Sequence, residues 1–331
     1  MKILVTGASG FLGAHLVRAF AVAGCTVLAG HRRGSDLERL RMLTSGFDGV
    51  TLVPADFDNF AELAAMLERN RPSLVVNAAA YGVNFGEQDL KKAIACNVTA
   101  AARLVDASAA NGIGRLIHIG SAFEYGVHAG LVSEETPLSP IGLYGATKAG
   151  GSLLALARAR ALGLPLCVVR PFGLFGPLEG AHKFVPQVFA AARTGKPLDC
   201  TPGEQIRDYT FVGDVTAALV RLADACPFPE GRTVNLASGK PITLRQLGEA
   251  ALEAAEAPTH LIRWGASSYR PNEVMCLAAD AHLSGELLGW SASTPLAVGL
   301  RESWESESLR AAGASPACPS PKQASPNAVP S

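Results

Sequence analysis

The chain has 331 residues and 48% of them are hydrophobic, which is enough to bury a large core and to form a main domain with a smaller one. Basic and acidic residues balance at 29 each, so overall charge draws the protein neither to nucleic acid nor to an anionic membrane. The seven cysteines are scattered without metal-ligand spacing, and we find no signal segment and no uninterrupted apolar span. We therefore expect a cytoplasmic protein that binds no metal, no nucleic acid and no membrane.

Short runs rich in valine, isoleucine and leucine alternate with alanine-rich stretches of helical pattern. The expected strands are residues 2–5, 26–28, 51–53, 74–76, 116–119 and 166–169. The expected helices are residues 12–23, 60–69, 90–110 and 144–162. Nearly continuous apolar strands that alternate with helices form parallel sheets covered on both faces. The pattern therefore predicts an α/β fold, a doubly wound Rossmann domain that binds its ligands at the carboxyl ends of the strands.

The composition changes after residue 170, where loops rich in proline and glycine surround shorter elements such as 233–236 and 244–255. We therefore predict three parts of the chain. The dinucleotide-binding domain is 1–170, with parts of 205–240 returning to it; the substrate-binding lobe is mainly 171–310; the tail is 311–331. The tail consists largely of alanine, serine and proline and lacks the apolar residues that order a chain, so we expect it to be disordered.

The first expected strand runs directly into a glycine-rich loop and an amphipathic helix. Gly7, Gly10 and Gly13 form a GxxGxxG pattern, with Phe11 and Leu12 at the start of the helix. Glycines at these positions allow a tight turn and bring backbone N–H groups against a pyrophosphate. A turn followed by a close helix–strand contact gives the same pattern, but its place on the first strand favours a dinucleotide site.

The residues after the second strand bear on the choice of cofactor. NAD-specific proteins usually carry an acidic residue there, which binds the adenine ribose hydroxyls. This chain has His31, Arg32 and Arg33 instead. Two guanidinium groups suit a 2′-phosphate, because arginine binds phosphate through paired, charge-assisted hydrogen bonds. We therefore predict a preference for NADPH, with NAD and a merely solvated basic loop as the alternative.

Two further strand ends are candidates for cofactor contacts. Asp56, followed by Phe57, comes after the third strand, and its carboxylate can accept a hydrogen bond from the adenine amino group. Ala78, Ala79 and Ala80 follow the fourth strand, and their small side chains let the backbone approach the cofactor. Either segment is also compatible with an ordinary loop, but the strand-end position favours cofactor contact.

Three residues form a candidate reaction centre. Tyr144 and Lys148 make a YxxxK pair near the start of a helix, so the phenol and the ammonium lie on one face. Lowering a tyrosine pKa from ~10 by ~3 units requires about 4 kcal/mol, which a positive charge ~4 Å away supplies at an effective dielectric of ~20. Ser121 ends the fifth strand and can orient a substrate carbonyl. Taken alone, a serine at this position is compatible with an ordinary turn residue. Together with the YxxxK pair and the glycine loop, it favours a catalytic role for Ser121.

At these residues the sequence resembles the extended short-chain dehydrogenase/reductase family, in particular its NAD-dependent epimerase/dehydratase group, which acts mainly on nucleotide sugars. The resemblance covers residues 1 to about 307. It implies that the serine, tyrosine and lysine above are catalytic and that Lys148 also binds the nicotinamide ribose. It further implies that Asn97 supports the site and that Pro171 and Phe172 border the nicotinamide.

The resemblance also implies a site for a nucleotide-sugar substrate. Arg207, within the sequence QIRDY, matches an arginine that binds the diphosphate, and Arg270 matches a second one; each alone is also typical of a surface ion pair. The family often has a substrate-binding asparagine at the position of Gly173, so the sugar contacts here are expected to differ. The remaining candidates for substrate contact are Ser121, Ala122, Phe123, Tyr144, Lys183 and Phe184.

The neighbours of the reaction centre bear on which reaction it performs. Dehydratases of this group carry an acidic pair where this chain has Ala122 and Phe123, so we do not expect dehydration. Epimerases retain NAD, which usually goes with an acidic residue after the second strand. We therefore predict NADPH-dependent reduction of the keto group of a nucleotide-diphospho-4-keto-6-deoxyhexose. The alternatives are an epimerase with bound NAD, an NADPH-dependent reductase of a ketone without a nucleotide, and a noncatalytic NADPH sensor.

Two of the expected helices, 90–110 and 144–162, are rich in small residues that permit close helix packing. In the family that the chain resembles, the corresponding helices pair between two subunits, which implies a homodimer. Burial within one subunit accounts for the same composition.

Overall fold

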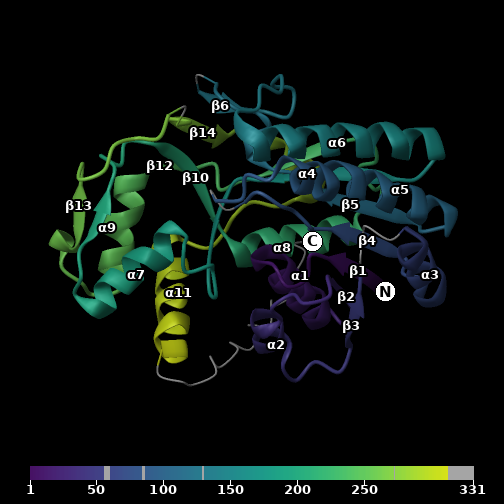
Figure 1. Cartoon of the computed structure of the whole chain (residues 1–331), viewed down its shortest axis with the longest axis horizontal. Helices are drawn as coiled ribbons and strands as arrows, with labels where there is room; N and C mark the ends of the chain where they lie inside the picture. The colour runs from purple at the N-terminus through teal and green to yellow at the C-terminus, as the bar shows by residue number, and fades with distance from the viewer. Residues whose placement is uncertain (56–59, 84–85, 129, 272, 312–331) are drawn as a thin grey trace, which may run out of the picture.

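The computed structural model describes residues 1–55, 60–83, 86–128, 130–271 and 273–311. Its main feature is a seven-stranded sheet in the order β11-β7-β5-β4-β1-β2-β3, with every neighbouring pair parallel (Figure 1). The strands are β1 (Lys2–Thr6), β2 (Thr26–His31), β3 (Val50–Pro54), β4 (Leu74–Asn77), β5 (Arg115–Ile119), β7 (Leu166–Pro171) and β11 (Thr233–Leu236). The predicted α/β, Rossmann-type fold is confirmed.

Helices cover both faces of this sheet (Figure 1). Those of one face are α1 (Phe11–Val22), α2 (Glu38–Thr44), α8 (Val212–Asp224) and α10 (His282–Leu288). Those of the other are α3 (Phe60–Asn70), α4 (Leu90–Ala93), the π-helix η1 (Ile94–Thr99), α5 (Ala100–Ala110) and α6 (Gly142–Leu162). Successive residues of β1 point to opposite faces: Ile3 and Val5 enter one core cluster and Leu4 enters the other. Burial on both faces explains why the strand is apolar throughout.

The helix that we predict over residues 90–110 is interrupted in the structure. Between α4 and α5 the chain forms η1, a π-helical segment of six residues. A π-helix is favoured by specific packing and not by local periodicity, so the apolar pattern does not reveal it. This segment lies against α6 and carries a site residue described below.

The remaining elements form the smaller lobe, left in Figure 1. One sheet has the order β12-β10-β14-β6, with β8 beside β10, and a second pairs β13 with β9. Its strands are β6 (Leu131–Val132), β8 (Gly173–Phe175), β9 (Leu198–Cys200), β10 (Ile206–Phe211), β12 (Pro241–Thr243), β13 (Ile262–Trp264) and β14 (Cys276–Ala279). Its helical elements are α7 (Phe184–Thr194), α9 (Leu244–Ala254) and α11 (Leu296–Ala311), with the short turn η3 (Thr259–Leu261). The short turn η2 (Ala122–Glu124) lies instead beside α6, directly after β5 of the main sheet.

Beyond residue 170 the structure also contains helices that we did not predict, α7, α8 and α11, which have 11, 13 and 16 residues. In α8 the buried residues Val215, Leu219 and Leu222 recur at helical spacing, a signal present in the sequence. The strand β11 returns from the second half of the chain to pair with β7. Among the described residues, no helix is both long and apolar enough to cross a membrane.

Candidate active site

The glycine loop joins β1 to α1 through a turn that excludes side chains. Gly7 has φ 65°, and a Cβ there would lie 2.7 Å from the backbone of Ala78. A Cβ at Gly13 would overlap the Gly7 carbonyl oxygen, so helix and loop are in direct backbone contact. Gly10 caps α1, leaving the N–H groups of the first helical turn, from Phe11 onward, without partners inside the helix. This arrangement fits a bound pyrophosphate.

Buried polar groups connect the ends of the central strands behind this loop. The Thr6 hydroxyl donates to Asn77 Oδ1 at 2.7 Å, and Asn77 Nδ2 lies 3.1 Å from Nδ1 of His118. Ala78, Ala79 and Ala80 follow as half-buried residues. The predicted contacts of Asp56 and Phe57 lie outside the described residues.

The two arginines after β2 differ in their surroundings. Arg33 forms an exposed ion pair with Glu62 at 2.8 Å. Arg32 lines a cleft of about 290 Å³ together with Ser9 and Ser35, and its side chain makes no hydrogen bond or ion pair with any residue that the structure describes. His31 completes β2 and is half-buried. Of the basic residues predicted here, Arg32 is therefore the one available to an anion in the cleft.

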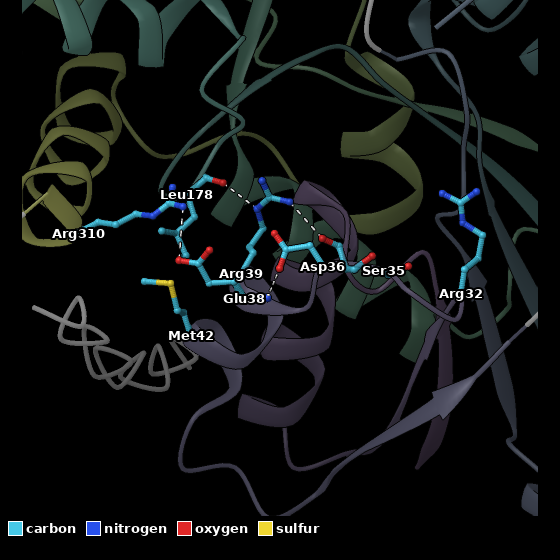
Figure 2. A pocket seen from close by; sticks show the side chains of 9 residues that line it. Arg32, Ser35, Asp36, Glu38, Arg39, Met42, Leu178 and Arg310 are labelled. Atoms are coloured by element: carbon cyan, nitrogen blue, oxygen red, sulfur yellow. Dashed lines mark hydrogen bonds and ion pairs between the residues drawn. The ribbon is translucent and has the colours of Figure 1, made fainter. Parts of the chain in front are cut away.

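Figure 2 shows Arg32 on one side of this cleft, Arg310 on the other, and Arg39, from α2, between them. Arg39 donates to the Ser9 carbonyl at 3.1 Å and to the Leu178 carbonyl at 2.8 Å. It thereby links the glycine loop to a segment 139 residues away in sequence. Arg39 is a residue of this cleft that the sequence did not reveal, because nothing in its local sequence indicates so distant a partner.

The acidic residues that line the cleft are engaged. Asp36 Oδ1 accepts a hydrogen bond from the backbone N–H of Glu38 at 2.9 Å. The Glu38 carboxylate lies 3.5 Å from Arg310 at the end of α11. Neither carboxylate follows β2 directly, the position at which an acidic residue binds ribose hydroxyls.

The structure brings Ser121, Tyr144 and Lys148 together. Ser121 follows β5 and caps η2, while the other two lie one turn apart near the start of α6. The Phe123 ring packs edge-on against Tyr144, with ring centroids 6.2 Å apart, and is 42% exposed. Ala122 is buried in an apolar cluster. The arrangement supplies a serine hydroxyl, a phenol and an ammonium at the carboxyl edge of the sheet.

Burial governs the protonation of this centre. It raises the pKa of Tyr144 to about 12, and a side-chain hydrogen bond with Ser121 partly offsets the rise. The direction is opposite to the lowering by Lys148 that the sequence predicts. Burial also lowers the pKa of Lys148, whose Nζ donates to the Ile119 carbonyl at 2.6 Å. The phenol is therefore protonated near neutral pH, the form that can give a proton to a substrate oxygen.

Asn97 lies in the π-helix η1 and connects three segments. Its Oδ1 accepts from the Tyr81 backbone N–H at 2.9 Å, and its Nδ2 donates to the Tyr81 carbonyl at 2.8 Å and to Thr147 Oγ1 at 2.9 Å. Thr147 directly precedes Lys148, so these bonds tie the loop after β4 to the helix of the reaction centre. π-helical segments are frequent at functional sites, and here the segment orients a buried amide.

The expected substrate residues fall into different environments. Gly173, on β8, pairs with Tyr209 on β10, and a Cβ at Gly173 would lie 2.8 Å from the Tyr209 ring. Lys183 Nζ donates to the Val83 carbonyl at 3.3 Å. The Phe184 ring packs against Trp264 at the hydrophobic core of the lobe.

The two arginines of the expected diphosphate clamp are not alike. Arg207 donates to Glu273 at 3.0 Å, and both side chains are largely buried. Arg270 is exposed. The joint binding of a diphosphate by Arg207 and Arg270 stays a prediction, and the pairing of Arg207 with Glu273 is a contact that the short motif around Arg207 does not indicate.

Pro171 and Phe172 come at the end of β7. Pro171 is half-buried, whereas the Phe172 ring belongs to an apolar cluster and lies 6.3 Å from the ring of Tyr125. The Phe172 backbone N–H donates to the Leu236 carbonyl at 3.1 Å. Its side chain is thus a packing residue that shapes the rim beside the reaction centre.

Comparison with known proteins places this site in a family. A model of the NAD dependent epimerase/dehydratase family matches residues 3–237, which include the glycine loop and the reaction centre. The chain belongs to the NAD-dependent epimerase/dehydratase family. The resemblance inferred from the motifs is thereby confirmed.

Relatives in the epimerase/dehydratase family carry several activities. UDP-glucose 4-epimerase of Mycolicibacterium smegmatis is 27% identical, covering 92% of this chain and 98% of its own length. The dTDP-6-deoxy-L-talose 4-dehydrogenase (NAD(P)+) of Kitasatospora kifunensis is also 27% identical, and the match covers 93% of this chain and 96% of the relative's own length. The first is an epimerase and the second a 4-dehydrogenase, so membership in the family leaves the reaction open.

Solved structures agree with the fold. MoeE5 in complex with UDP-glucuronic acid and NAD superimposes with a TM-score of 0.82 at 28% identity, covering 94% of this chain and all of its own. The dTDP-glucose 4,6-dehydratase of Bacillus anthracis, in complex with NAD, superimposes with a TM-score of 0.85 at 21% identity. The match covers 96% of this chain and 99% of the dehydratase chain. The second likeness, at its low identity, shows the fold alone.

Proposed function

We propose that the protein reduces the keto group of a nucleotide-diphospho-4-keto-6-deoxyhexose with NADPH. The observation that carries this proposal is Arg32, a guanidinium without a partner among the described residues, beside a cleft next to the glycine loop. A dinucleotide with a 2′-phosphate would place its extra charge near this group. A cofactor that is bound reduced and released oxidised suits a reductase, whereas an epimerase regenerates its cofactor in each turnover.

In this reduction, each residue of the reaction centre has a separate role. Ser121 holds the substrate carbonyl by a hydrogen bond, and Tyr144, protonated at neutral pH, donates its proton to the carbonyl oxygen. Lys148 lies one helical turn after Tyr144, and its Nζ is held at the strand end by its hydrogen bond to the Ile119 carbonyl. The reduced nicotinamide, when bound, supplies the hydride.

The surroundings of Ser121 argue against dehydration. Eliminating water from the sugar needs an additional acid and base near the reacting carbons. Ala122 is buried among apolar side chains and Phe123 offers no titratable group. Glu124 is the nearest acid in this segment, but its carboxylate is fully buried and paired with Arg170. The 4-dehydrogenase relative supports redox chemistry at the sugar C4 on a related chain.

The function is tested by following NADPH oxidation with dTDP-4-keto-6-deoxyglucose as substrate and identifying the deoxysugar formed. We expect stoichiometric consumption of NADPH. A protein that copurifies with NAD and interconverts UDP-glucose and UDP-galactose without added cofactor would be an epimerase. To separate a reductase of ketones without a nucleotide, Arg207→Leu is compared with wild type: a nucleotide-sugar reductase should show a raised KM for the nucleotide sugar.

Replacing Arg32 should change the preference for cofactor. Arg32→Ala removes one charge-assisted hydrogen bond to the 2′-phosphate, worth about 1.5–3 kcal/mol, and is expected to weaken NADPH binding about 10- to 100-fold without weakening NADH binding. Fluorescence titration of both cofactors measures this difference. Arg33→Ala is the matched control, because Arg33 is exposed and paired with Glu62, and it should bind NADPH as wild type does. An equal loss of NADH affinity in Arg32→Ala would refute the assignment.

We also propose a homodimer that forms through α4, η1 and α6. Leu153 on α6 is 56% exposed, and Leu90, Ile94 and Leu154 are exposed on the same group of helices. Leu153→Glu is expected to shift sedimentation from dimer to monomer at micromolar concentration. Val298→Glu, at a position 47% exposed on α11, is the control and should remain dimeric. Wild-type protein that sediments as a monomer would contradict the proposal.

A further inference from the structure

One buried carboxylate lies directly behind the reaction centre. Glu124 is 0% exposed. Its Oε1 accepts from the Ser121 backbone N–H at 2.9 Å and from the Ser152 hydroxyl at 2.8 Å, and its Oε2 accepts from Arg170 Nε at 2.8 Å. The three donors belong to the end of β5, to α6 and to β7. A single side chain therefore joins the segment of Ser121 to the helix of Tyr144 and Lys148.

The position of each partner matters for this geometry. Ser152 follows Lys148 by four residues, so its hydroxyl lies on the face of α6 that carries the tyrosine and lysine. A Cβ at Gly120 would lie only 2.5 Å from Glu124 Oε1, so the strand end is shaped around the carboxylate. Arg170 is held in place by stacking on Tyr125, 4.7 Å from the ring centroid. The carboxylate is thus fixed from three sides.

Ser121 is constrained on both its backbone and its side chain. Glu124 takes the Ser121 N–H, while Ser121 Oγ accepts from the Phe123 N–H at 3.2 Å. Together these bonds form a capping box around η2. Ser121 Oγ accepts the Phe123 N–H and keeps its own O–H proton as a donor, which can serve the side-chain hydrogen bond with Tyr144 or a substrate carbonyl.

We propose that Glu124 is a positioning residue: its carboxylate sets the separation between the Ser121 hydroxyl and the Tyr144 phenol by bonding at once to the end of β5 and to Ser152 on α6. This rests on the proposed roles of Ser121 and Tyr144 in ketone reduction. A displacement of ~1 Å between reacting groups can cost about 100-fold in rate, so loosening one of these bonds affects turnover before binding. A purely stabilising ion pair would affect unfolding and leave turnover of the folded protein unchanged.

The bond to α6 is tested with Ser152→Ala. We expect a fall in kcat of about tenfold for NADPH oxidation with dTDP-4-keto-6-deoxyglucose, with KM and the Kd for NADPH within about twofold of wild type. Ser108→Ala is the matched control, because Ser108 is a fully buried helical serine whose hydroxyl has no partner within the described residues. It should leave kcat unchanged. Equal kcat values for the two variants would overturn the proposal.

The carboxylate itself is tested by two double variants that both remove the buried charge pair. Glu124→Gln with Arg170→Met keeps an oxygen acceptor for Ser121 and Ser152, whereas Glu124→Leu with Arg170→Met removes it. Both avoid an unpaired buried charge, so both are expected to fold. We expect the glutamine variant to retain kcat within about threefold of wild type and the leucine variant to lose about tenfold or more. Wild-type kcat in the folded leucine variant would refute the proposal.

The proposed function and the positioning role fail in different ways. If wild-type protein does not oxidise NADPH with the ketosugar, the function is wrong. The same variants are then compared in the epimerisation of UDP-glucose with NAD, where the same pattern of kcat values is expected from positioning. A protein active in either assay whose variants all retain wild-type kcat would refute the positioning role alone.

Discussion

Tyr144→Phe is expected to lower the kcat of ketone reduction by about 10²- to 10⁴-fold, the range that general acid catalysis contributes. The substitution removes one oxygen and leaves the ring that packs against Phe123. Cofactor and substrate affinities should therefore change little. Steady-state rates together with NADPH titration measure the two effects separately.

The pH dependence of the wild-type enzyme follows from the same group. Because burial raises the pKa of Tyr144 to about 12, the phenol is protonated from pH ~6 to ~9 and the reductive kcat should be flat over that range. Tyr269→Phe is the control, since that phenol lies in the lobe and bonds to Glu204. It should keep kcat at the wild-type value. A Tyr144→Phe variant with wild-type kcat would exclude Tyr144 as the acid and would leave a noncatalytic cofactor sensor as the better description.

Two adjacent glycines in α6 are expected to respond in opposite ways to alanine. A Cβ at Gly151 would overlap the Asn97 carbonyl oxygen in η1, whereas the nearest atom to a Cβ at Gly150 is 3.7 Å away, on Val98. Gly151→Ala should therefore destabilise the protein by about 1–3 kcal/mol, as overpacking does. Gly150→Ala should stabilise it by about 0.5–1 kcal/mol, because glycine within a helix is unfavourable relative to alanine.

Denaturant unfolding of the two variants measures these free energies. Gly151→Ala is also expected to lower kcat, because moving α6 away from η1 stretches the bond between Asn97 and Thr147 and shifts the helix of Tyr144. Gly150→Ala should keep the wild-type kcat and so serves as the internal control. If both variants were stabilised alike, the close contact of α6 with η1 would not exist in solution.

Local sequence patterns were sufficient to predict the central part of the fold and to identify the residues of the candidate reaction centre. The strand–loop–helix unit around Gly7 is contiguous, and six of the seven strands of the main sheet, all except β11, coincide with apolar runs predicted from the sequence. Tyr144 and Lys148 lie four residues apart in one helix, so helical geometry alone places them on one face. Ser121 follows a strand, and parallel strands bring their carboxyl ends to one edge.

The charges around the site could not be predicted in the same way. Arg32 and Arg33 are adjacent in sequence, yet Arg33 pairs with Glu62 and Arg32 faces the cleft. Arg207 pairs with Glu273, 66 residues away, which the expectation of a diphosphate clamp did not include. Which partner a charge meets depends on how separate elements pack, and short motifs carry no information on that.

Some features of the reaction centre follow from local sequence, and others follow only from the tertiary structure. By itself, the sequence determined a parallel α/β sheet, a glycine loop on its first strand and a serine, tyrosine and lysine at the sheet edge, because periodicity and spacing are local properties. Only the tertiary structure decided that burial raises the pKa of Tyr144. Only the tertiary structure joined Glu124 to partners 28 and 46 residues away, because a buried carboxylate is stabilised by whichever donors the packing of distant segments brings to it.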